Sequence, residues 1–135
     1  MEKKGTGLKR VEYQQVKKYV ESLPIEPVKV ETAVPVGKGE YVRPTEPPFI
    51  RRMVHALTSL KIDLLIMHRD GTPEICECKE RARAGAVGQL IIYEHLLKAD
   101  GLVDIKKTII CRSIHPDVQN VCFELGINVV IYTEI

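Results

Sequence analysis

Apolar and polar residues alternate along this chain with two periods, one typical of helices and one typical of strands. Apolar residues recur every three or four positions in four stretches, and Pro24 ends the first of them. Apolar, β-branched runs between those stretches predict strands. The helices are predicted over residues 8–22, 49–60, 84–98 and 116–125, and the strands over 28–36, 62–67, 75–79, 107–112 and 128–132. This order predicts an α/β fold.

Local features of these elements predict their places in the fold. The helix 84–98 is apolar nearly all round, so we expect it to be mostly buried. The run 108–111 is continuously apolar, which indicates burial on both faces of a sheet. Strand–helix–strand units with short links favour parallel pairing. The irregular segment 24–48 predicts an edge strand and a loop beside the site. We expect residues 1–135 to form one domain, with residues 1–7 flexible.

The strands 62–67 and 75–79 form a predicted hairpin, because Arg69-Asp70-Gly71 has strong turn chemistry. A two-residue loop would place Asp63 and Glu77 on opposite faces. A three-residue loop, with Gly71 left-handed, would pair Asp63 directly with Glu77. We favour the odd-length loop, or an equivalent bulge, which also puts Lys79 on the face of Glu77.

Charged side chains in apolar strands are expensive unless they pair or bind a metal ion. Two carboxylates on neighbouring strands repel each other, so the Asp63–Glu77 pair makes physical sense mainly with a divalent cation between them. The simpler alternative is a salt-bridged hairpin in which Lys79 pairs with Asp63 or Glu77.

The composition limits the class of protein but does not identify a binding partner. The chain has 135 residues, 44% hydrophobic and 28% charged, as is usual for a soluble domain. A net charge of +2 neither demands nor excludes nucleic acid. No apolar run predicts a membrane span or a signal peptide, so we expect a cytoplasmic protein whose four cysteines are reduced thiols. Cys76 and Cys78 should face the core, and a Cys-x-Cys metal or redox site is the less favoured alternative.

Three features of the chain resemble the PD-(D/E)XK nuclease superfamily: Asp63, the run Glu77-Cys78-Lys79, and the Gln-x-x-x-Tyr element from Gln89 to Tyr93. The Gln-x-x-x-Tyr element resembles the RecB-like branch of that superfamily. The small size and Glu12 on the first helix are similar to archaeal Holliday-junction resolvases. The chain departs from the motif at Ile62, which stands where the motif has proline. The resemblance implies a restriction-endonuclease-like core: a central mixed sheet, made of an antiparallel hairpin and a β-α-β unit, flanked by helices.

The resemblance also implies that the protein is a divalent-metal-dependent nuclease that hydrolyses phosphodiester bonds, and DNA is the expected substrate. Asp63, Glu77 and the backbone carbonyl of Cys78 would hold Mg²⁺ or Mn²⁺, and Glu12 would contribute through water. Lys79 would orient the attacking water or stabilise charge on the phosphoryl oxygens. Gln89 would position Lys79 or the DNA backbone.

The remaining predicted contacts are to the nucleic acid itself. Arg81 and Arg83 are candidates for phosphate contacts that position the nucleic-acid strand. Tyr93 is a candidate for a further phosphate contact, although a Tyr on a buried helix as often packs in the core. Resolvases act as dimers, so a homodimer is possible. The alternative function is an inactive module of the same fold that binds nucleic acid or assembles with a partner.

Overall fold

The computed structural model describes residues 8–134, so the prediction for residues 1–7 lies outside the described part. All four predicted helices and five predicted strands are present, with ends that differ by a few residues. The elements follow in the order α1 (Arg10–Ser22), β1 (Lys29–Val36), α2 (Pro48–Thr58), β2 (Leu60–Met67), β3 (Pro73–Ala82), α3 (Ala84–Ala99), β4 (Lys106–Ile114), α4 (Pro116–Glu124) and β5 (Asn128–Ile131).

The strands form one mixed five-stranded sheet in the order β1-β2-β3-β4-β5. β1, β2 and β3 pair antiparallel, and β3, β4 and β5 pair parallel through the crossover helices α3 and α4. The predicted mixed sheet is therefore confirmed, and β1 is an edge strand as expected.

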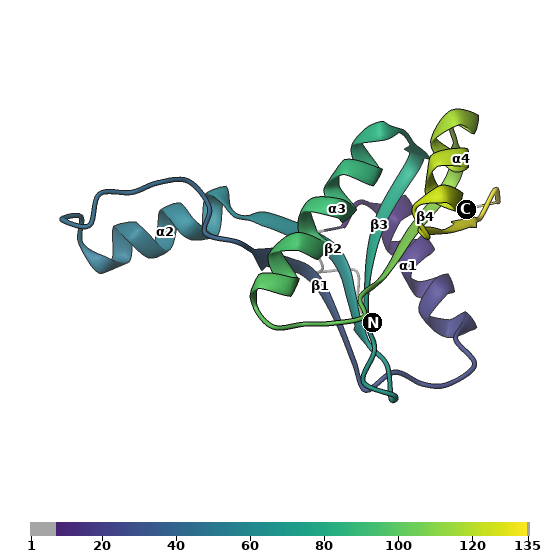
Figure 1. Cartoon of the computed structure of the whole chain (residues 1–135), viewed down its shortest axis with the longest axis horizontal. Helices are drawn as coiled ribbons and strands as arrows, with labels where there is room; N and C mark the ends of the chain where they lie inside the picture. Colours follow the sequence, from purple (N-terminus) through teal and green to yellow (C-terminus); the bar gives the residue numbers. More distant parts are fainter. Residues whose placement is uncertain (1–7, 135) are drawn as a thin grey trace.

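Helices cover both faces of the sheet (Figure 1). α1 packs on one face through Val16 and Tyr19, against a cluster that includes Cys76 and Cys78. α3 and α4 pack on the other face in a larger cluster. The burial of the two cysteines and of the whole run 108–111 confirms both predictions about them.

The prediction that α3 is mostly buried is wrong in part. Ile91 and Ile92 are 40% and 49% exposed, because the helix packs on the sheet through one side only and no further layer covers its outer side. The buried side carries Ala86, Leu90, Tyr93 and Leu97. No helix within residues 8–134 is long and apolar enough to cross a membrane.

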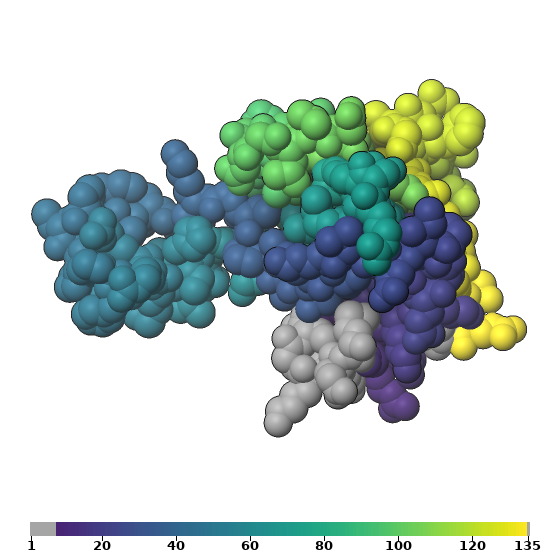
Figure 2. Space-filling view, turned by 90° about the horizontal axis from the view of Figure 1, so that it is seen from below, coloured from purple at the N-terminus to yellow at the C-terminus, as the bar shows by residue number. Residues whose placement is uncertain are grey.

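α2 confirms the predicted short helix, but its position could not be foreseen. We call residues 37–59, which connect β1 to β2, the arm. Figures 1 and 2 show the arm projecting away from the body of the molecule. No residue of α2 is buried, so the helix takes no part in either core.

Candidate active site

The turn of the hairpin fixes which residues of β2 and β3 face each other. The backbone N–H of His68 donates to the carbonyl of Thr72 (3.0 Å), and Gly71 has a φ of +89°. The pairs run from Met67 opposite Pro73 to Leu64 opposite Cys76. One further step along this register places residue 63 opposite residue 77, so the predicted odd-length loop is confirmed.

A bend in β1 and β2 positions Asp63. The β1–β2 ladder continues on both sides of Asp63 but skips it and the facing Ala33. Ala33 has a φ of +50°, a left-handed conformation that is unfavourable for a residue other than glycine. Leu64 packs in the α1 cluster, whereas Ile62 packs in the α3 cluster. The Asp63 carboxylate accepts a hydrogen bond from the backbone N–H of Cys78 (2.9 Å), which ties it to β3.

Glu77 is a buried carboxylate that the protein leaves half satisfied. It is 1% exposed, and its Oε1 has no hydrogen-bond partner among the described residues. Its Oε2 lies 3.6 Å from the Nζ of Lys79. Burial, followed by the charge of Asp63, raises the pKa of Glu77 to about 8, and Lys79 opposes the shift. Within residues 8–134, Lys79 is the one cation that forms an ion pair with Glu77.

The donor set fits a hard divalent cation. Mg²⁺ prefers oxygen ligands and is usually held by one or two carboxylates together with several waters. Asp63 and Glu77 supply two carboxylates, and the Oε1 of Glu77 is an acceptor that no group within residues 8–134 satisfies. Within residues 8–134, no group of three or more His, Cys, Asp or Glu side chains is placed to hold a metal ion. The protein side chains would therefore leave much of the coordination shell to water.

α3 brings Tyr93 and Gln89 beside the carboxylate pair. Tyr93 is 3% exposed, and its hydroxyl donates to the backbone carbonyl of Lys61 (2.9 Å). Burial and then the charges of Glu77 and Asp63 raise the pKa of Tyr93, while a hydrogen bond with Gln89 lowers it. The Tyr93 hydroxyl already has a partner that fixes α3 to the start of β2.

Glu12 lies near the start of α1, the helix that packs on the face of the sheet opposite α3. Its carboxylate accepts a hydrogen bond from the backbone N–H of Lys9 (3.3 Å) at the start of α1. Its charge acts on Cys78, whose thiol pKa is raised mainly by burial and further by Asp63, Glu77 and Glu12. Glu12 does not join the two carboxylates in a group that could hold a metal ion.

Gln15 is a residue near the site that the sequence did not assign to it. It is fully buried on α1, and its Nε2 donates to the backbone carbonyl of Lys79 (3.0 Å), while its Oε1 has no partner among the described residues. This bond holds the backbone that carries the lysine. The signal was available: Gln15 is a polar residue within the apolar series of the first helix.

The two predicted phosphate-contacting arginines lie beyond Lys79 on the same chain segment. Both are exposed. Arg81 donates to the hydroxyl of Ser113 on β4 (3.3 Å). Arg83 precedes α3 and lines a hollow with Val87 and Val118. Neither guanidinium forms an ion pair with Asp63 or Glu77, but both are exposed at this end of β3.

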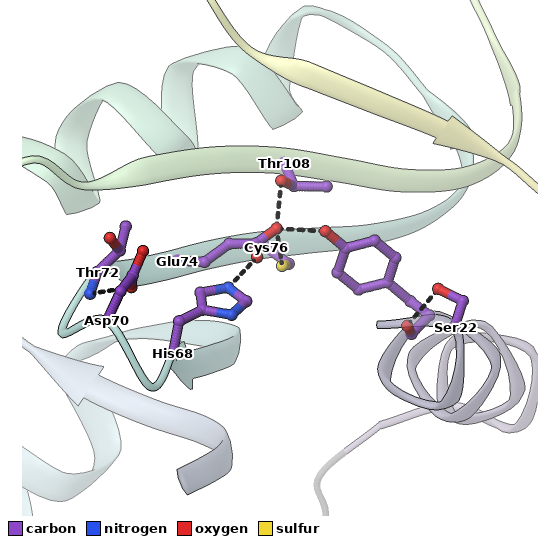
Figure 3. Close-up of polar contacts among 8 residues, drawn as sticks. Ser22, His68, Asp70, Thr72, Glu74, Cys76 and Thr108 are labelled. Atoms are coloured by element: carbon purple, nitrogen blue, oxygen red, sulfur yellow. Dashed lines mark hydrogen bonds and ion pairs between the residues drawn. The ribbon is translucent and has the colours of Figure 1, made fainter. Parts of the chain in front are cut away.

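Glu74 is a second buried carboxylate, and the sequence did not predict its role. It lies at the start of β3 and faces α1 (Figure 3). Its two oxygens bond to Tyr19, Thr108 and His68, each at 2.6 Å. Burial alone would raise the pKa of Glu74, but these hydrogen bonds outweigh it and the pKa is lowered. This carboxylate is fully satisfied within the protein.

Comparisons with known proteins support the fold. No family model matches the chain, and no curated protein matches it. Among solved structures, a repair endonuclease from Pyrococcus abyssi is similar (TM-score 0.58, 15% identity, covering 93% of this chain and 47% of that one). EndoMS in apo form is also similar, with a TM-score of 0.58 and 16% identity, covering 93% of this chain and 47% of that one. An EndoMS-dsDNA2 complex has a TM-score of 0.55 and 18% identity, covering 98% of this chain and 48% of that one.

The chain thus spans about half the length of the endonucleases that it matches. The shared arrangement of the mixed sheet and its flanking helices is the restriction-endonuclease-like core that the sequence predicted.

Proposed function

We propose that this chain is a divalent-metal-dependent nuclease of the PD-(D/E)XK type that hydrolyses phosphodiester bonds in DNA. The observation that carries the proposal is the state of Glu77, a buried carboxylate with an unpartnered oxygen beside Asp63 and Lys79. The similarity of the fold to repair endonucleases, one of them in complex with dsDNA, supports the choice of reaction and substrate.

Each residue of the site has a definite task in this proposal. Asp63, Glu77 and the carbonyl of Cys78 would hold Mg²⁺ or Mn²⁺, with Glu12 acting through water. A bound divalent cation supplies an activated water and charge neutralisation at the phosphoryl oxygens. Lys79 orients the attacking water and stabilises negative charge on the phosphoryl group, and Gln15 fixes its backbone. Gln89 positions Lys79 or the DNA strand.

The DNA backbone would extend from Lys79 towards Arg81 and Arg83, whose contacts to phosphates fix the register of the strand without reading its sequence. Tyr93 stays a candidate for a further phosphate contact, which would require its hydroxyl to leave the carbonyl of Lys61. An inactive module of the same fold would be favoured by a Lys79 turned away from Glu77. The 3.6 Å separation of their charged atoms gives that alternative no support.

A cleavage assay tests the proposal. The wild type and Glu77→Ala are incubated with single-stranded, duplex and four-way-junction DNA in Mg²⁺, Mn²⁺ or EDTA. We expect cutting by the wild type in either metal and none in EDTA, and a rate at least about a thousandfold lower for Glu77→Ala. A wild type that cuts none of these substrates, or a variant that cuts equally well, contradicts the proposal. The preferred substrate indicates the branch of the nuclease family.

A further inference from the structure

The arm has a net positive charge. Residues 37–59 contain four basic side chains and two acidic ones, a net charge of +2. A positively charged projection is a candidate surface for a polyanion.

The positive charge of the arm is largely uncompensated within the protein. Arg43 pairs with Glu46 at 3.1 Å. Arg51 and Arg52 lie on α2, are exposed, and form no ion pair with any residue in the range 8–134. Together with His55 and Pro48 they line an open hollow of about 560 Å³. Two free guanidinium groups on one surface suit phosphate oxygens, which accept their hydrogen bonds in pairs.

The base of the arm is held in a fixed shape. The backbone N–H of Glu40 donates to the hydroxyl of Thr58 (2.7 Å), and a ring nitrogen of His55 lies 3.1 Å from the carbonyl of Gly37. At Gly39, where φ is +71°, a Cβ atom would lie only 2.6 Å from the Thr58 hydroxyl oxygen. Glycine thus allows the outgoing and returning segments to approach closely. The arm is a braced projection and can present α2 in a defined position.

The arm also starts at the end of the sheet that carries the candidate active site. It leaves β1 after Val36 and enters β2 at Leu60. Asp63 follows only three residues after Leu60, which corresponds to roughly 10 Å along a strand. A phosphate bound at Asp63 and Glu77 would therefore lie roughly 10 Å from the base of the arm.

We propose that the arm is a DNA-binding element that lies along duplex DNA beside the cleavage site, with Arg51 and Arg52 on backbone phosphates. This inference rests on the proposed function for the choice of polyanion. The exposed apolar side chains of Phe49, Met53 and Leu57 recur every fourth residue on another side of α2 and take no part in this contact.

Binding in EDTA tests the arm separately from catalysis. The affinity for a labelled duplex is measured by fluorescence anisotropy over a series of salt concentrations. The variant is Arg51→Ala/Arg52→Ala, and the matched control is Arg10→Ala/Lys17→Ala, which removes two exposed positive charges from α1. We expect the arm variant to bind about tenfold more weakly and to lower the slope of log affinity against log salt by about 1.8, since each phosphate contact contributes about 0.9. The control should stay within about twofold of the wild type.

Equal affinity and salt slope for the arm variant and the wild type overturn the inference. It is also overturned if light scattering shows a wild-type dimer that the arm variant converts to a monomer, because the arm would then bind a second copy of the chain. If the wild type cuts no DNA but binding still depends on Arg51 and Arg52, the nuclease proposal fails and the arm inference stands. If cutting depends on Glu77 but the affinity for DNA does not depend on Arg51 and Arg52, the nuclease proposal stands and the arm inference fails.

Discussion

Glu74 and Glu77 are both buried and lie three residues apart on the same strand, yet their hydrogen bonding and the directions of their pKa shifts differ. Glu74 faces α1 and receives three short hydrogen bonds, which lower its pKa. Glu77 faces α3 beside Asp63, keeps one oxygen unpartnered, and has its pKa raised to about 8. The strand itself is the same for both; only the surrounding elements differ.

This difference separates the structural role of Glu74 from the metal-binding role that we propose for Glu77. A buried carboxylate with every oxygen satisfied joins elements together: Glu74 connects α1, the hairpin loop and β4 (Figure 3). A buried carboxylate that the chain fails to satisfy is unfavourable for folding, so its retention requires another explanation. A bound cation supplies one, because it would neutralise both carboxylates of the pair.

The largest effect on stability is expected for Glu74→Ala. The substitution leaves the hydroxyls of Tyr19 and Thr108 and the ring of His68 without their buried acceptor. We expect the free energy of unfolding to fall by about 4 kcal/mol, measured by urea denaturation. A loss below about 1 kcal/mol would show that water replaces the carboxylate, and the contrast with Glu77 would disappear.

A smaller effect of opposite sign is expected for Glu77→Gln in EDTA. The amide keeps the shape of the side chain but removes the repulsion with Asp63, so the free energy of unfolding at pH 8 should rise by about 2 kcal/mol. Glu74→Gln is the matched control on the same strand and should lower stability, because its charge-assisted hydrogen bonds weaken. Adding Mg²⁺ should stabilise the wild type but not Glu77→Gln. A Glu77→Gln that is less stable than the wild type in EDTA would contradict this interpretation.

The smallest effect concerns acid. The folded-state pKa of Glu74 is below that of an exposed Glu, so its ionised form stabilises the fold above the ordinary Glu pKa. That contribution is lost as pH falls through the lowered value. We expect the stability difference between the wild type and Glu74→Gln to shrink as the solution is acidified below pH 4.5, in denaturation curves recorded at several pH values. A difference that stays constant through this range would mean that Glu74 is not ionised in the fold.

The sequence by itself determined the order of elements and the core of the site. The apolar periods fixed the helices and strands, because burial selects one face of each element. The turn residues Arg69-Asp70-Gly71 fixed the hairpin, and the period of two along a strand then brought Asp63, Glu77 and Lys79 to one place. These features are local, because each depends on residues that are close together in the sequence.

Only the tertiary structure decided which buried polar groups are satisfied and which elements lie at the surface. Glu74 meets Tyr19 and Thr108, which are 55 and 34 residues away in the chain, and Gln15 meets the carbonyl of Lys79 across 64 residues. No local pattern encodes such distances. The same reason applies to α2 and to the outer side of α3: an apolar period predicts that a helix has an apolar face, but whether another layer covers that face depends on the packing of the whole chain.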